Sequence, residues 1–421
     1  MPRGHAHRSL LGPLALVLTL AGCALDLDRL RAGAGDAAID GSTDAATTDG
    51  GREDGGPIDG GDDDGGDDGG VPPRCECGAT GRWQRSSITF PGTVTRRVTA
   101  VDLDRDGDVD FVATVDGGPP VAVVQLPREC ESPTLDLFPI ETHLPESSTP
   151  VAYDADSERP LGLAIPQTEP TLLVHQARGR DATYSFPDTT TLTLPVPART
   201  VFSYDVTGAS GTDLVLGTDR PEFFFLPRLG RTTGAHDSGS RLDVAAFQRV
   251  SGSAVWLFGG QVGGSSVHAI RFVDGVPSVP ASTERPGFAL SDVVVGDIDS
   301  DGNDEALYLD SAAGLVLVRR VSGSTTIEVR DITILPSTWA IAAADLDGDG
   351  AVELVGARRD ANDVDIYDLE GETVTRVESI TLEAPASVLA EDVDGDGWAD
   401  LIVGHALGGR AAITVMRQLC R

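Results

Sequence analysis

Short blocks of hydrophobic residues alternate with polar, glycine-containing blocks along most of this chain. The segments 111–115, 354–357 and 401–404 are typical: each is a run of four or five mostly apolar residues that directly follows an acidic turn. Runs of this length, rich in β-branched residues and bounded by aspartate and glycine, predict β-strands rather than helices. The chain is therefore expected to be all-β.

The acidic turns share a pattern of nine residues. Carboxylates stand at positions 1, 3, 5 and 9, and glycine stands at position 6, in copies that begin at Asp102, Asp297, Asp345 and Asp392. Oxygen ligands around a sharp turn suit a hard cation, and calcium best. An EF-hand is excluded, because it needs a glutamate at position 12 and a helix on each side. Here the twelfth residue is never acidic and the flanking segments resemble strands.

The pattern also recurs in weaker form, and this repetition predicts the fold. Degraded copies begin at residues 154, 205 and 247, so that seven units start at 102, 154, 205, 247, 297, 345 and 392. A unit of about fifty residues holds four short strands, which is one blade of a propeller. We therefore predict a seven-bladed β-propeller of four-stranded blades over residues 71–421. The last unit is too short for a fourth strand, and we expect the segment Ser86–Phe90 to complete it.

The repeated phrase resembles the FG-GAP or VCBS repeat, which builds the calcium-bearing propeller of integrin α-subunits and of many bacterial surface proteins. The resemblance is specific in the first, fifth, sixth and seventh units. It implies calcium as the cofactor. The implied side-chain ligands are Asp102, Asp104, Asp106 and Asp110; Asp297, Asp299, Asp301 and Glu305; Asp345, Asp347, Asp349 and Glu353; and Asp392, Asp394, Asp396 and Asp400. Backbone carbonyls at position 7 would add Asp108, Asn303, Ala351 and Trp398.

The first 70 residues are expected to export and tether the propeller. Residues 1–23 combine Arg3 and Arg8 with a short apolar run that ends at Cys23. Such a run is too short to span a bilayer, and its end resembles the lipobox of bacterial lipoproteins, in which Cys23 would carry the lipid. The alternative is an ordinary signal peptide. Residue 24 is alanine, which favours the outer membrane or cell surface, and residues 24–70 are rich in glycine and aspartate, which predicts a disordered tether.

Four further cysteines are expected to form disulfides in an exported chain. They are Cys75, Cys77, Cys130 and Cys420. We expect Cys420 to pair with one of the two closely spaced cysteines and Cys130 with the other, while the choice of partner stays open. A zinc site at Cys75 and Cys77 is the competing hypothesis, although one intervening residue is a narrow bite for tetrahedral zinc.

The net charge and the absence of known catalytic motifs argue against several classes of function. The formal net charge is −34 and every basic residue is arginine, so the chain offers no basic surface for nucleic acid or anionic lipid. The sequence contains no G-x-S-x-G, H-E-x-x-H or G-x-x-x-x-G-K-[ST] motif, so we expect no enzymatic activity. The aromatic candidates for a sugar surface are Tyr204, Phe223 to Phe225, Trp256, Trp339 and Trp398, most of which we expect to fill the cores between blades.

These observations favour a lipid-anchored, calcium-binding propeller of the cell envelope, monomeric, that acts in adhesion by binding a protein or a glycan. The alternative is an extracellular propeller hydrolase or lyase that acts on a polymer. A structural envelope protein with no small ligand is the third hypothesis. The expected partner is an unknown protein or polysaccharide of the cell envelope or surface.

Overall fold

The computed structural model describes residues 82–103, 109–117, 121–125, 136–140, 150–153, 162–178, 185–208, 211–227, 233–250, 254–322, 325–370 and 373–418. The segments predicted as signal peptide and tether, and Cys23, lie outside these residues. So do Cys75, Cys77, Cys130 and Cys420, together with Asp104, Asp106 and Asp108 of the first acidic turn. The predictions for all of them stay predictions.

The described residues form seven antiparallel sheets, which we call blades 1 to 7. Blade 1 consists of β2 (Val94–Val101), β3 (Asp110–Asp116), β4 (Val121–Gln125) and β5 (Asp136–Ile140). Blade 2 consists of β6 (Val151–Tyr153), β7 (Gly162–Pro166), β8 (Thr171–Arg178) and β9 (Ser185–Thr193). Blade 3 consists of β10 (Thr200–Tyr204), β11 (Asp213–Gly217), β12 (Glu222–Leu226) and β13 (His236–Asp237).

Blade 4 has five strands instead of four, because two short strands both pair with its third strand. It consists of β14 (Val244–Val250), β15 (Ala254–Gly260) and β16 (Ser266–Val273), with β17 (Val276–Pro277) and β18 (Ala281–Glu284) both paired to β16. Blade 5 consists of β19 (Leu290–Gly296), β20 (Glu305–Asp310), β21 (Leu315–Ser322) and β22 (Thr325–Thr333). Blade 6 consists of β23 (Ala340–Ala344), β24 (Glu353–Arg358), β25 (Asp363–Glu370) and β26 (Thr373–Thr381).

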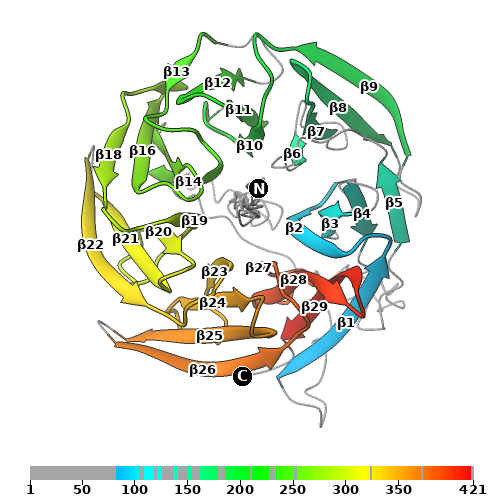
Figure 1. Cartoon of the computed structure of the whole chain (residues 1–421), viewed down its shortest axis with the longest axis vertical. Helices are drawn as coiled ribbons and strands as arrows, with labels where there is room; N and C mark the ends of the chain where they lie inside the picture. Colours follow the sequence, from blue (N-terminus) through cyan, green and yellow to red (C-terminus); the bar gives the residue numbers. More distant parts are fainter. Residues whose placement is uncertain are drawn as a thin grey trace, which may run out of the picture. The chain divides into compact units, whose positions relative to one another are not determined.

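Blade 7 joins the two ends of the described chain, as the sequence predicted. It consists of β27 (Ser387–Glu391), β28 (Asp400–Leu407), β29 (Arg410–Gln418) and β1 (Trp83–Phe90). β1 runs antiparallel to β29, with Trp83 opposite Gln418 and Phe90 opposite Ala411. Figure 1 shows the blades around a common centre, with β2, β6, β10, β14, β19, β23 and β27 innermost and β1 at the outer edge of blade 7. The fold is a β-propeller closed by its first strand, which leaves no unpaired edge on β29.

Apolar side chains fill the spaces between neighbouring blades. All seven residues of β15 are buried, because both faces of a central strand pack against adjacent blades. Between blades 3 and 4, the rings of Tyr204 and Phe247 stack at a centroid distance of 5.0 Å. Continuous burial explains why the strands appear in the sequence as apolar runs rather than as alternating patterns. Of the aromatic candidates for a sugar surface, Tyr204, Phe223 to Phe225 and Trp256 belong to these cores, whereas Trp339 and Trp398 are only half-buried.

The fourth repeat confirms the expected outline but not the expected boundary. We placed the start of its degraded turn at Phe247, yet β14 continues to Val250, and Val250 lies opposite Ala254. The turn in blade 4 is therefore much shorter than the acidic turns. Within the described residues, no helix is long and apolar enough to cross a membrane.

Candidate metal centre

The acidic turns occupy equivalent places in their blades. Each one connects the innermost strand to the second strand: residues 297–304 link β19 to β20, residues 345–352 link β23 to β24, and residues 392–399 link β27 to β28. The innermost strands of a propeller all run in the same direction, so these connections emerge on one face of the ring. We call this the turn face.

The carboxylate at position 9 is buried at the start of the second strand. Glu305, Glu353 and Asp400 have exposed fractions of 1%, 6% and 0%. Each accepts a hydrogen bond from the backbone amide at position 2 of its own turn, from Ile298 at 3.2 Å, Leu346 at 2.6 Å and Val393 at 3.2 Å. Asp110 of the first turn repeats this arrangement with Leu103 at 2.9 Å. This hydrogen bond fixes the two ends of the turn to one another.

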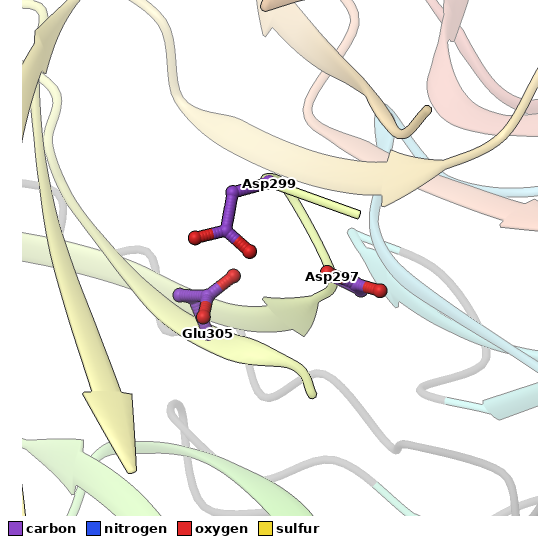
Figure 2. A group of neighbouring side chains, drawn as sticks. All are labelled: Asp297, Asp299 and Glu305. Carbon is purple, nitrogen blue, oxygen red and sulfur yellow. The ribbon is translucent and has the colours of Figure 1, made fainter. Parts of the chain in front are cut away.

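The carboxylates at positions 1 and 3 converge on the buried one. Within the described residues, three such groups have ligand oxygens that all lie within 4.8 Å of one another and could hold a metal ion: Asp297, Asp299 and Glu305; Asp345, Asp347 and Glu353; and Asp392, Asp394 and Asp400. Figure 2 shows the first group, in which the carboxylates of Asp299 and Glu305 face each other and Asp297 lies to their right in the view. All three groups come from the residues that the resemblance implied.

Position 1 and the glycine at position 6 together shape the turn. The amides of Gly302, Gly350 and Gly397 donate to the position 1 carboxylates at 2.8, 3.0 and 2.8 Å. These glycines have φ angles of 84°, 91° and 89°, which lie in the left-handed region that side chains disfavour. The pattern therefore requires glycine at position 6 because of the backbone conformation of the turn.

The implied side-chain ligands at position 5 lie outside these three groups. Asp301, Asp349 and Asp396 do not join the three groups of converging carboxylates. Each instead accepts the amide of the position 7 residue, from Asn303 at 2.9 Å, Ala351 at 2.8 Å and Trp398 at 2.9 Å. A short acidic side chain readily forms this local turn with the backbone two residues on. Ligation by position 5 and by the position 7 carbonyls stays a prediction.

Burial raises the pKa of the position 9 carboxyls in blades 6 and 7, which makes them weaker acids than usual. It raises the pKa of Glu353 from 4.5 to about 7, and the charges of Asp347, Asp345 and Asp349 add to the rise. It raises the pKa of Asp400 from 3.8 to about 8, and Asp394 and Asp396 add to that rise. Buried like charges disfavour ionisation, whereas a bound cation would favour it. The donor set, made only of oxygens, therefore fits a hard divalent ion.

In blades 5 and 3, an arginine pairs with carboxylates of the acidic turn. In blade 5, Arg320 contacts the carboxylates of Asp299, Asp301 and Glu305. In blade 3, which keeps only positions 1 and 9, Asp205 pairs with Arg249 at 3.1 Å, and the amide of Thr207 donates to Asp213 at 2.8 Å. The sequence pattern predicts Asp205 and Asp213 as the preserved ends of a degraded turn, but it predicts neither arginine. No local signal identifies them, because each reaches the turn from another strand.

Comparisons with known proteins agree with the propeller fold. Residues 345–403, which include the acidic turns of blades 6 and 7, match the family model of the FG-GAP-like repeat. No curated protein matches the sequence. Among solved structures, the chain is similar to BBS1N in two crystal structures of its complex with ARL6DN. The structure soaked with mercury has a TM-score of 0.58 at 12% identity and covers 80% of this chain and 97% of that chain.

The structure soaked with lead gives a TM-score of 0.58 at 13% identity and covers 81% of this chain and 98% of that chain. Likeness at this identity concerns the fold alone, and it supports a propeller over nearly all of the described residues. The chain is therefore a β-propeller that carries FG-GAP-like repeat sequence at residues 345–403.

Proposed function

We propose that this chain is a calcium-binding β-propeller of the cell envelope, anchored through a lipid on Cys23, which binds a protein or polysaccharide through its turn face. The observation that carries the proposal is the convergence of Asp345, Asp347 and Glu353, whose ligand oxygens lie within 4.8 Å of one another. Among the described residues, no arginine forms an ion pair with any of these three.

The proposed role of calcium is structural. Three carboxylates held this closely repel one another, and a divalent ion at their centre removes the repulsion and fixes the turn between β23 and β24. Calcium suits the site better than magnesium, because it accepts several carboxylates together with backbone carbonyls in an irregular geometry. The carbonyl of Ala351 would complete this set at position 7.

Partner binding on the turn face is supported by what this face exposes. In blade 5, residues 299–304 are exposed, and in blade 7 Trp398 is half-buried at position 7. A loop held by a cation presents such groups in one conformation, which lowers the entropy lost on binding. We propose a binding module rather than an enzyme. The experiment must distinguish this module from the alternative, a hydrolase or lyase that cleaves a polymer.

The test uses the full chain on immobilised envelope polysaccharides and on envelope protein extract, with excess calcium or with EDTA. Binding is expected in calcium, and it should fall in EDTA and in an Asp347→Asn variant. An exposed control variant, Asp360→Asn, should bind like the wild type. Binding unaffected by both EDTA and Asp347→Asn would contradict the calcium-dependent module. Release of soluble saccharide would establish the enzymatic alternative.

A further inference from the structure

The side chain of Arg320 reaches the acidic turn of blade 5. It stands on β21 directly opposite Glu305 on β20. Its Nε is 3.1 Å from Glu305 Oε1, and its Nη2 is 3.3 Å from Asp301 Oδ2 and also contacts Asp299 Oδ2. One guanidinium thus contacts the carboxylates at positions 3, 5 and 9, which are the groups that a bound cation would share.

The corresponding turn of blade 6 has a different residue across the strand. The register of β24 and β25 places Leu354 opposite Tyr367, and its continuation places Glu353 opposite Asp368. An acid there cannot neutralise the turn. Blades 5 and 6 therefore have the same nine-residue pattern and the same converging carboxylates, but they differ in the charge that faces position 9.

Blade 3 supplies an independent example of an arginine in this role. Arg249 Nη2 is 3.1 Å from Asp205 Oδ2, and the same nitrogen donates to the Asp205 carbonyl oxygen. Its guanidinium also lies over the Tyr204 ring, 5.8 Å from the centroid. The planar guanidinium carries several donors and keeps its charge at every accessible pH, so it can hold several carboxylates at once.

We propose that Arg320 is the resident cation of the blade 5 turn, so that residues 297–305 bind no calcium while residues 345–353 bind one ion. The calcium half of this statement rests on the proposed function. The arginine half does not, because the guanidinium is covalently attached and cannot be removed by a chelator. The resemblance to the repeat family would assign calcium to both turns alike, and the structure separates them.

The proposal is tested by counting the calcium ions bound to the full chain, with native mass spectrometry and isothermal titration calorimetry. Asp347→Asn should bind one ion fewer than the wild type, whereas Asp299→Asn should bind the same number. Arg320→Gln should gain one ion, and the double variant Arg320→Gln with Asp299→Asn should lose it again. Arg410→Gln, which removes an exposed arginine on β29, should leave the number unchanged.

Two results would overturn the proposal: Asp299→Asn lowers the wild-type number by one, or folded Arg320→Gln binds no additional ion. The Asp299→Asn measurement decides the matter even where Arg320→Gln does not fold. Failure of the proposed function is a separate outcome. A wild-type chain that binds no calcium, beside an Arg320→Gln variant that binds one ion, would remove the calcium role of blade 6 and support the role of Arg320.

Discussion

Replacing Glu353 by glutamine should have opposite effects on stability with and without calcium. Burial raises the pKa of Glu353 from 4.5 to about 7, so calcium-free folding favours the protonated carboxyl. The stability from this group is fully present below pH 4.5 and is lost as the pH rises through about 7. At about 1.4 kcal/mol per pKa unit, the calcium-free folded state is destabilised at pH 8 by roughly 3 kcal/mol as an upper figure.

Glutamine removes this cost because it cannot ionise, and its side-chain oxygen can still accept the amide of Leu346, which lies 2.6 Å from Glu353 Oε2. In EDTA at pH 8, Glu353→Gln should therefore raise the free energy of unfolding by up to about 3 kcal/mol, and at pH 5 the gain should shrink. In excess calcium the order should reverse, because the variant has lost a charged ligand.

Urea denaturation of the full chain at pH 5 and pH 8, in EDTA and in calcium, measures all four conditions. Glu284→Gln is the matched control, since Glu284 is exposed on β18 and lies outside the acidic turns. A Glu353→Gln variant that is less stable than the wild type in EDTA at pH 8 would refute the reasoning from burial and like charge.

Three further substitutions test the fold. Trp83→Ala should lower the free energy of unfolding by about 3–5 kcal/mol in urea denaturation, because Trp83 is 8% exposed, packs in the core between blades 6 and 7 and anchors β1. The control Val279→Ala changes a side chain that is 84% exposed and should have little effect. Asp365→Asn should lower the free energy of unfolding by about 2–3 kcal/mol, since buried Asp365 pairs with Arg358 at 3.2 Å and Arg376 at 3.3 Å. A loss of stability no larger than that of Asp360→Asn, at an exposed residue, would contradict this reasoning. Gly259→Ala should lower the free energy of unfolding by about 1–3 kcal/mol, because a Cβ there would lie 2.2 Å from the Val244 carbonyl oxygen. The control Gly234→Ala adds a Cβ that meets nothing within 4 Å and should melt like the wild type.

The repeat predicted the architecture because the same local sequence pattern forms the same strands and turn in blade after blade, and these strands pack against neighbouring blades in the same way. The spacing of the acidic turns indicated seven blades, and the unassigned strand near Ile88 indicated the closure with β29. The fourth boundary was wrong because Phe247 to Val250 resemble a degraded turn in the sequence, whereas the ladder with β15 keeps them in a strand.

The candidate site was predicted only as far as it is local. Positions 1, 3 and 9 converge within one turn, so their spacing along the chain was sufficient. Arg320 lies fifteen residues beyond Glu305, and only the register of β20 and β21 brings the two together. A pattern of nine residues contains no information on the cross-strand neighbour, which decides whether the turn needs an external cation.

The central claim is that calcium holds the acidic turn of blade 6, and the melting temperature of the full chain tests it most directly. Scanning calorimetry in excess calcium and after complete chelation should show a clear rise with calcium, since a ligand at a hundred times its dissociation constant adds about 2.7 kcal/mol per site. Superimposable melting curves in calcium and in EDTA would contradict the account.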